Sequence, residues 1–161
     1  AIASSINNIK HIMSQMTIQT IGHDKINQLR HARFFKDIDG LKHHMSLHGD
    51  ILRPKFEAVL KEFDAQLEGT GIARWTAPKG GYFISFDALE GCAKEIVAKC
   101  KEAGVVLTAA GAPFPYGIDP KDSVIRIAPT YPSIEELEEA IQVFATVARL
   151  VSVDKLLSEM K

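Results

Sequence analysis

Hydrophobic residues recur at three- and four-residue steps over five stretches of the chain, the spacing of one face of an α-helix. These predicted helices cover about 4–16, 24–35, 41–67, 89–103 and 134–151. Ser133 and Glu136 form a capping box at the start of the last helix, and Asp87 and Glu90 have the same spacing before the fourth. We therefore expect Asp87 to cap that helix.

Two features interrupt the long third stretch. Asp39-Gly40 predicts a break before it, since glycine after aspartate is typical of turns. Pro54 lies within it and predicts either a kink or the start of a new helix, because proline lacks the backbone donor and its ring clashes with the preceding turn.

The periodicity changes after Gly71. Residues 72–76 and 82–86 are predicted as two strands of a β-hairpin around a turn with two glycines. Residues 105–108 and 123–128 are predicted as further strands, joined by a loop that proline and glycine interrupt. This order of elements predicts an α+β fold, a two-layer sandwich of a small, mainly antiparallel sheet with helices on one face.

Composition indicates an ordinary globular protein. The chain has 161 residues, of which 46% are hydrophobic, and a formal net charge of -1. This charge gives little attraction for polyanions, so we expect no nucleic-acid partner, and no apolar stretch is long enough for a membrane span. Cys92 and Cys100 lie too far apart on one predicted helix to form a disulfide, and are expected to be reduced core residues of a cytoplasmic protein.

Several residue sets resemble catalytic or binding motifs only in part. His44 and His48 lie one helical turn apart and could bind a metal, but no third ligand is indicated, so we favour solvated histidines and expect no metal site. Ser85 and Asp87 lack the Gly-x-Ser-x-Gly context of a hydrolase. Gly80-Gly81 is followed by a strand, which indicates a turn and not a phosphate-binding loop.

Arg126 is the most informative polar residue. It lies between Ile125 and Ile127 in a predicted strand, and therefore faces away from both. A guanidinium there needs an anion or water, so three alternatives stay open: a structural ion pair, an exposed sheet face, or a site for an anionic ligand. The loop before it, 109–117, is of the kind that shapes ligand sites.

Three stretches in a fixed order resemble one known family. The first is Trp75–Phe83, which contains a Pro-x-Gly-Gly-x-Phe hairpin, and the second is Val105–Phe114. The third is Ser123–Pro129, which contains Arg126, and the capped helix follows it. Residues 50–161 resemble the C-terminal part of fold type I pyridoxal-phosphate aminotransferases of class I/II. The amino-acid sequences of residues 19–22, 28–34 and 126–132 most resemble a bacterial aspartate aminotransferase subgroup of this family.

The resemblance implies a division of the chain and a set of site residues. Residues 1–40 would be a helical remnant of the cofactor-binding large domain, 41–67 a connecting helix, and 50–161 the small C-terminal domain. Arg126 would bind the substrate α-carboxylate. The substrate-pocket loops would include Tyr82, Phe83, Gly111 and Phe114. The substrates would be an amino acid and a 2-oxo acid, and the intact enzyme would be a homodimer.

The resemblance also implies pyridoxal 5'-phosphate as the cofactor. Ser-x-x-Lys occurs only at Ser152–Lys155 and Ser158–Lys161, after the small-domain stretches, and this is not where the family has its cofactor lysine. The resemblance therefore implies that the lysine that binds the cofactor would lie upstream. The chain is therefore expected to be a C-terminal fragment that holds no catalytic or cofactor-binding residue and is inactive alone. Ala110 stands where the family usually has proline, before Gly111.

Two other functions fit the same fold. One is a stand-alone α+β module that binds amino acids for regulation, and the other is a pyridoxal-phosphate lyase. The two short amphipathic helices at the start argue against the module, because a self-contained sensor has no use for helices without a packing partner.

Overall fold

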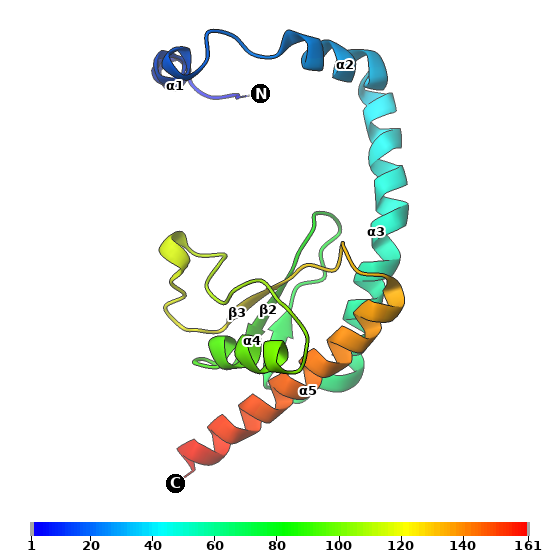
Figure 1. Ribbon diagram of the computed structural model, residues 1–161, viewed down its shortest axis with the longest axis vertical. Helices are drawn as coiled ribbons and strands as arrows, with labels where there is room; N and C mark the ends of the chain where they lie inside the picture. Colours follow the sequence, from blue (N-terminus) through cyan, green and yellow to red (C-terminus); the bar gives the residue numbers. More distant parts are fainter. Residues whose placement is uncertain (1, 161) are drawn as a thin grey trace. The chain divides into compact units, whose positions relative to one another are not determined.

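The computed structural model of the protein describes residues 2–160. Its elements are α1 (Ile6–Gln19), α2 (Lys25–Phe35), α3 (Ile38–Leu67), β1 (Ala73–Trp75), β2 (Ile84–Ala88), α4 (Ala93–Glu102), the short 3-10 helix η1 (Pro115–Gly117), β3 (Val124–Ile127) and α5 (Ile134–Glu159), as Figure 1 shows. The chain divides into two compact units, with the boundary between Leu47 and His48.

The first unit contains α1, α2 and the beginning of α3. Both short helices were predicted, and both begin with a side-chain cap: Ser5 accepts a hydrogen bond from the Asn8 amide, and Asp24 accepts one from the Asn27 amide. Neither helix has a buried residue. Their exposed apolar side chains include Ile6, Met13, Ile18, Ile26, Leu29 and Phe34.

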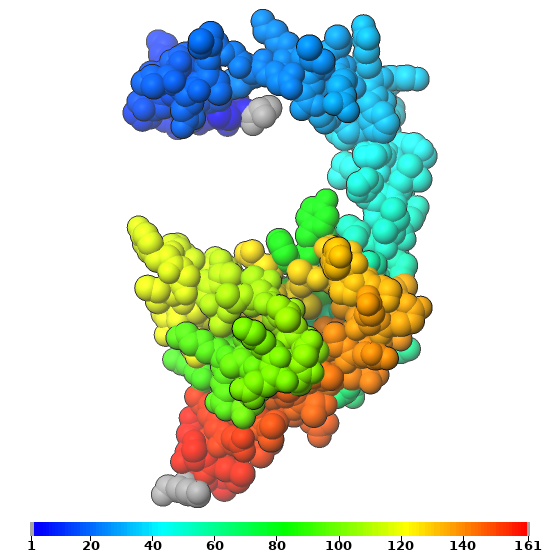
Figure 2. Space-filling view, viewed as in Figure 1, coloured from blue at the N-terminus to red at the C-terminus, as the bar shows by residue number. Residues whose placement is uncertain are grey.

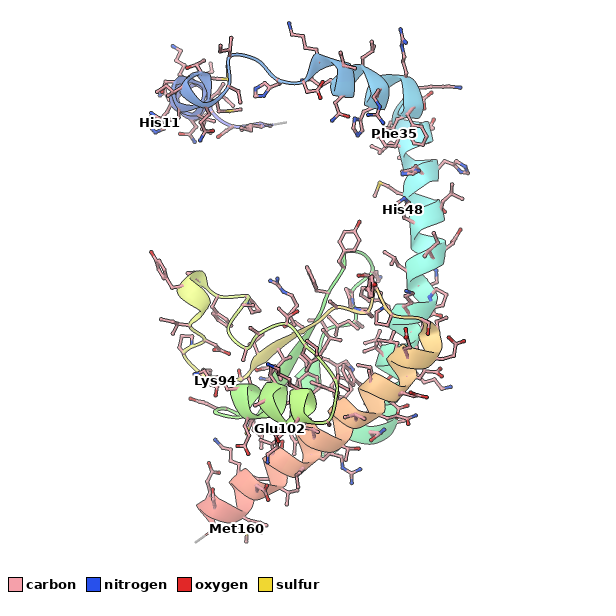
Figure 3. The ribbon with its side chains drawn as sticks, viewed as in Figure 1. His11, Phe35, His48, Lys94, Glu102 and Met160 are labelled. Carbon is pink, nitrogen blue, oxygen red and sulfur yellow. The ribbon has the colours of Figure 1, made fainter. Side chains whose placement is uncertain are left out.

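The predicted break at Asp39-Gly40 is wrong, because both residues lie inside α3. The α2–α3 junction falls just before them, next to Phe35, which Figure 3 labels. A Cβ atom at Gly40 would lie 2.0 Å from the Phe35 carbonyl oxygen. The Gly40 amide donates to Asp37 Oδ1 at 2.8 Å. Glycine is thus needed for a close approach within the first helical turn, and does not end the helix.

Pro54 also lies inside a helix. The α3 helix continues through it to Leu67, so no new helix starts there. Beyond Pro54, four apolar residues of α3 are buried: Phe56, Val59, Phe63 and Leu67.

The second unit contains a three-stranded antiparallel sheet in the order β1-β2-β3. The predicted hairpin is confirmed, since Trp75 of β1 pairs with Phe86 of β2. On the other side of β2, Ser85 pairs with Arg126 of β3. Because side chains alternate along a strand, one face of this sheet is apolar and the other is polar.

Aromatic rings from strands and helices meet on the apolar face. Phe63 of α3 lies 5.4 Å from Trp75, 5.2 Å from Phe86 and 5.7 Å from Phe144 of α5, measured between ring centroids. Phe86 and Phe144 meet edge to face at 4.8 Å. Buried residues of α4, among them Ile96, complete the same core. The predicted α+β sandwich, with helices on one face of a small sheet, is confirmed.

The prediction of a strand at 105–108 is wrong. This segment has no strand hydrogen bonds, and the Val105 amide donates to the Cys100 carbonyl oxygen at 2.8 Å, at the end of α4. Val105 and Leu107 instead pack against the core as partly buried side chains. An apolar run that side-chain packing buries cannot be distinguished from a strand by periodicity alone.

The predicted cap of α4 is also wrong. Asp87 lies within β2, and α4 begins only at Ala93. The cap comes from a distant residue: Asp122 accepts the Ala93 amide through its carbonyl oxygen at 2.8 Å and the Lys94 amide through its carboxylate at 3.2 Å. The free amides at the start of α4 are therefore satisfied by the segment that leads into β3.

The predicted capping box of α5 is confirmed. Ser133 Oγ accepts the Glu136 amide at 3.2 Å, and Glu136 Oε2 accepts the Ser133 amide at 2.9 Å. The C-terminal end of α5, red in Figure 2, exposes Leu150, Val153, Leu157 and Met160. Within residues 2–160, no helix has both the length and the apolar character needed to cross a membrane.

Both cysteines belong to the core, as predicted. Cys92 and Cys100 are free thiols with exposed fractions of 1% and 0%. Burial raises the pKa of Cys100 to about 11. This thiol therefore stays protonated at neutral pH.

Candidate functional site

The polar face of the sheet carries the candidate site. In β2, Ile84 and Phe86 are fully buried, whereas Ser85 and Asp87 point to the opposite face. Ser85 pairs across the strands with Arg126, which therefore shares this outer face. The site residues are placed by the two-residue period of the strands and by their pairing register.

Arg126 has the orientation that the sequence predicts. Its neighbours Ile125 and Ile127 are buried, with exposed fractions of 1% and 2%. Arg126 itself is half-buried. Its guanidinium carbon lies 4.5 Å from the centroid of the Phe83 ring. Such a cation–π contact contributes roughly 0.5–2 kcal/mol and restricts the orientation of the guanidinium plane.

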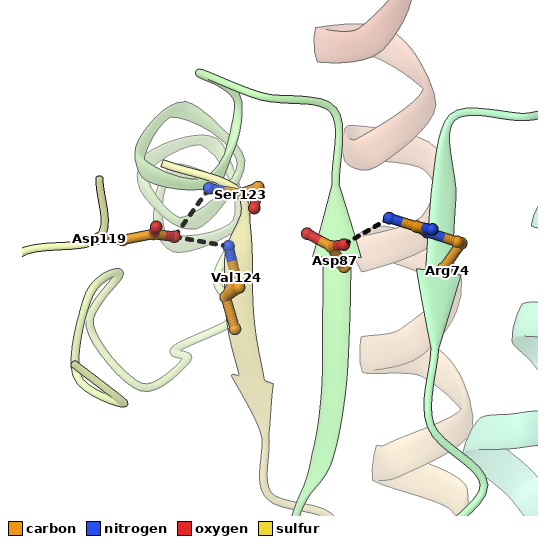
Figure 4. Close-up of polar contacts among 5 residues, drawn as sticks. All are labelled: Arg74, Asp87, Asp119, Ser123 and Val124. Carbon is orange, nitrogen blue, oxygen red and sulfur yellow. Dashed lines mark hydrogen bonds and ion pairs between the residues drawn. The ribbon is translucent and has the colours of Figure 1, made fainter. Parts of the chain in front are cut away.

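The two arginines of the outer face differ in their partners. Arg74 Nη2 lies 3.1 Å from Asp87 Oδ2, an ion pair across β1 and β2 that Figure 4 shows. Within residues 2–160, no carboxylate oxygen lies within 4.0 Å of the Arg126 guanidinium. Arg126 therefore has no structural ion-pair partner in the described part of the chain. Two of the three interpretations of Arg126 remain: an exposed sheet face and a site for an anionic ligand.

Asp119 holds the beginning of β3. Its carboxylate accepts hydrogen bonds from the amides of Lys121 at 3.0 Å, Ser123 at 2.9 Å and Val124 at 2.8 Å, two of which Figure 4 shows. Burial alone would raise the pKa of Asp119, but these backbone hydrogen bonds outweigh burial and lower it. The carboxylate is therefore charged at neutral pH.

Lys55 holds the segment that follows β3. Its ammonium donates to the Thr130 carbonyl oxygen at 2.9 Å and also to the Pro132 carbonyl oxygen. Lys55 lies on α3 and is half-buried. A charged donor thus satisfies two backbone acceptors in the connection from β3 to α5.

The loop before β3 has a backbone that requires glycine. Gly111 has φ +84, and a Cβ atom there would lie 2.1 Å from the Gly117 carbonyl oxygen. The Phe114 amide donates to the Gly111 carbonyl oxygen at 2.9 Å, and the Gly117 amide donates to the Phe114 carbonyl oxygen at 3.1 Å. The loop is thus a series of tight turns, with Phe114 half-buried in it.

The sequence-predicted pocket residues are only partly brought together. Phe83 contacts Arg126, and its neighbour Tyr82 lies beside it in the chain with 57% of its surface exposed. Among residues 2–160, no hydrogen bond or cation–π contact joins Arg126 to Tyr82, Gly111 or Phe114. The role of these three residues stays a prediction.

His44, considered above as half of a metal site, packs against aromatic rings. Its ring centroid lies 5.2 Å from that of Phe34 and 5.4 Å from that of Phe35. In the described part of the chain, no group of three or more His, Cys, Asp or Glu side chains is placed to hold a metal ion. The His44 side chain therefore contributes to the packing between α2 and α3.

Comparison with known proteins identifies the family. The profile described as "Aspartate amino-transferase" matches residues 1–160. A presumed aminotransferase of Mycolicibacterium smegmatis is 44% identical over 158 residues, which are 98% of this chain and 37% of that protein. An aspartate transaminase structure from Corynebacterium glutamicum has a TM-score of 0.88 at 41% identity, covering 94% of this chain and 36% of that chain.

A more distant structure shares the fold. It is an α-aminoadipate aminotransferase from Thermus thermophilus, complexed with N-(5'-phosphopyridoxyl)-L-leucine, with a TM-score of 0.72 at 17% identity and coverage of 92% of this chain and 37% of that one. The chain spans a little over a third of the length of the curated relatives it matches, at 37% and 35%. The family match includes the first two helices, which a stand-alone sensor module would not share. The chain belongs to the aspartate aminotransferase family.

Proposed function

We propose that this chain is the substrate-orienting C-terminal part of a pyridoxal-phosphate-dependent aminotransferase that acts on aspartate and a 2-oxo acid. Arg126 binds the α-carboxylate of both substrates. The observation that carries this proposal is the Arg126 guanidinium, which lies against Phe83 on the polar sheet face with no carboxylate partner among residues 2–160. Membership in the family and the similarity to the aspartate transaminase of C. glutamicum support it.

The chemistry of a guanidinium fits a carboxylate. Its planar fork donates two parallel hydrogen bonds to the two oxygens, and each such charge-assisted bond is worth roughly 1.5–3 kcal/mol. Ser85, the strand neighbour of Arg126, is small and uncharged, which leaves room beside the guanidinium. Binding both oxygens fixes the orientation of the substrate, and this alignment raises the rate without any proton transfer by Arg126.

We propose that residues 2–160 do not form the cofactor site by themselves. When bound, the cofactor supplies the electron sink for transamination, and its site needs a lysine amine. Lys55 and Lys155 donate to backbone carbonyl oxygens, and Lys99 pairs with Glu95 at 3.6 Å. We propose that the cofactor-binding lysine lies in another part of the enzyme, and that the 161-residue chain alone does not catalyse transamination.

A binding experiment tests this division of labour. The 161-residue chain is incubated with pyridoxal phosphate, dialysed, and treated with borohydride. We expect no retained cofactor absorbance and no specifically labelled lysine. A stable absorbance with a single labelled lysine in this chain would contradict the proposal.

Tyr82, Phe83, Gly111 and Phe114 are proposed to shape the substrate pocket around Arg126. Phe83 has direct support, because its ring lies under the guanidinium. Gly111 and Phe114 belong to the tight-turn loop that leads toward β3. Their contribution is the shape of the pocket wall, because neither residue has a charged side chain.

Steady-state kinetics of the full-length enzyme test the role of Arg126. Arg126→Ala should raise KM for amino acid and oxo acid alike and lower kcat/KM at least about 100-fold, since two charge-assisted hydrogen bonds are lost. Arg126→Lys should recover only part of the lost kcat/KM, because an ammonium lacks the planar fork of a guanidinium. Arg74→Ala is the matched control, since Arg74 lies on the same face but is paired with Asp87. Equal effects of the two alanine substitutions would contradict the proposal.

A further inference from the structure

The strand that bears Arg126 has little to hold it within the sheet. In the described part of the chain, β3 pairs with β2 alone, so its other edge has no ladder partner. The strand is also short, spanning Val124–Ile127. A short edge strand can shift along its partner or fray, and either movement would displace the Arg126 guanidinium.

Two charged side chains from outside the strand hold its two ends. Asp119 is buried, with 8% of its surface exposed, and its carboxylate accepts the amides of Ser123 and Val124, where β3 begins. Lys55 donates to the carbonyl oxygens of Thr130 and Pro132, just beyond the end of β3. The stretch that contains Arg126 is thus fixed by charge-assisted hydrogen bonds at its beginning and just beyond its end.

The two contacts act on the backbone and not on the Arg126 side chain. The Asp119 and Lys55 side chains are charged, and the groups that they contact are peptide amides or carbonyls. Each contact therefore sets the position of the main chain. Between them, the register Ser85↔Arg126 places the guanidinium on the outer face. A displacement of about 1 Å in a group that aligns a substrate can cost 100-fold in rate.

We propose that Asp119 and Lys55 are positioning residues of the substrate-carboxylate site, which hold β3 so that the Arg126 guanidinium meets the α-carboxylate in the correct place. This inference rests on the proposed role of Arg126. Neither Asp119 nor Lys55 touches the substrate in this scheme, and both act through Arg126.

A double-mutant cycle in the full-length enzyme tests the inference. Asp119→Asn and Lys55→Met are each measured alone and together with Arg126→Ala. Each substitution alone should raise KM for amino acid and oxo acid about tenfold, with a smaller change in kcat. In the Arg126→Ala background, the further effect on kcat/KM should vanish, whereas the loss of melting temperature should persist.

Conservative variants and surface controls complete the design. Lys55→Arg keeps a charged donor, so its KM should stay close to that of the wild type. Asp64→Asn and Lys61→Met remove the same charges from exposed positions of α3, and should leave kinetics unchanged. If Asp119→Asn fails to fold, Lys55→Met and Lys55→Arg still decide the question at the other end of the strand.

The outcomes separate this inference from the proposed function. If Asp119→Asn and Lys55→Met lower kcat/KM by the same factor in the wild-type enzyme and in the Arg126→Ala enzyme, both residues are merely structural and the inference is wrong. If they leave KM unchanged while Arg126→Ala raises it, the inference is wrong and the proposed function stands. If Arg126→Ala itself leaves KM unchanged, the proposed function fails, and the inference fails with it.

Discussion

The guanidinium carbon of Arg126 lies 4.5 Å from the centre of the Phe83 ring. Phe83 immediately precedes β2, the strand to which Arg126 is paired. A cation–π contact is an attraction between the positive charge and the ring face, and it uses no N–H donor of the guanidinium. The contact can therefore hold the arginine without occupying the donors that bind a carboxylate.

Removing this ring should weaken substrate binding. In the full-length enzyme, Phe83→Leu keeps an apolar side chain but loses the cation–π contact, which is worth roughly 0.5–2 kcal/mol. We expect KM for both substrates to rise about 2- to 30-fold, as steady-state kinetics would measure. Phe83→Tyr keeps the ring and should behave like the wild type. Equal KM values for the leucine variant and the wild type would show that the contact has no role in binding.

Asp119 should make the protein sensitive to acid. Its pKa is lowered in the folded state, because the backbone hydrogen bonds to the carboxylate outweigh its burial. A lowered folded pKa contributes stability that is complete above about pH 4, the ordinary aspartate pKa, and is lost as pH falls through the folded value.

This loss can be measured by chemical denaturation between pH 7 and pH 2. The advantage in unfolding free energy of the wild type over Asp119→Asn should be largest at neutral pH and should shrink below about pH 4. Asp64→Asn, at an exposed position of α3, serves as the control. An advantage that stays constant over the whole pH range would show that the Asp119 carboxylate has no net ionic role.

Gly111→Ala should destabilise the protein more than Gly117→Ala. Both glycines have positive φ, +84 and +71, so alanine costs about 1–2 kcal/mol at either position. At Gly111 the new Cβ would also lie 2.1 Å from the Gly117 carbonyl oxygen, whereas nothing lies within 4 Å at Gly117. Thermal denaturation of the two variants measures the difference. Equal melting temperatures would mean that the loop relaxes around the added methyl group.

Local sequence signals predicted most elements of the fold. The capping box at Ser133, the glycine turn between β1 and β2, and the helical periodicity of α3 each involve residues close together in the sequence. Two of the predictions that failed depend on distant contacts. The cap of α4 comes from Asp122, and the apolar segment at 105–108 is buried by packing without strand pairing.

The candidate site shows the same division. The two-residue period was enough to predict which way Arg126 faces, since Ile125 and Ile127 flank it. Asp119 was not predicted as a site residue, although Asp119-Pro120 gave a local signal, because Asp-Pro is a common start of a turn. Lys55 had no such signal, because its acceptors lie at Thr130 and Pro132, far along the chain.

The most direct experiment measures whether Arg126 recognises the α-carboxylate itself. In the full-length enzyme, kcat/KM is measured for an amino acid and for its analogue with a carboxamide in place of the α-carboxylate. The wild type should prefer the acid at least about 100-fold, because the amide offers no charge and only one acceptor oxygen. In Arg126→Ala this preference should fall close to one, whereas Arg74→Ala should keep it. A preference that survives in Arg126→Ala would contradict the proposed role of Arg126, because another group would then bind the carboxylate.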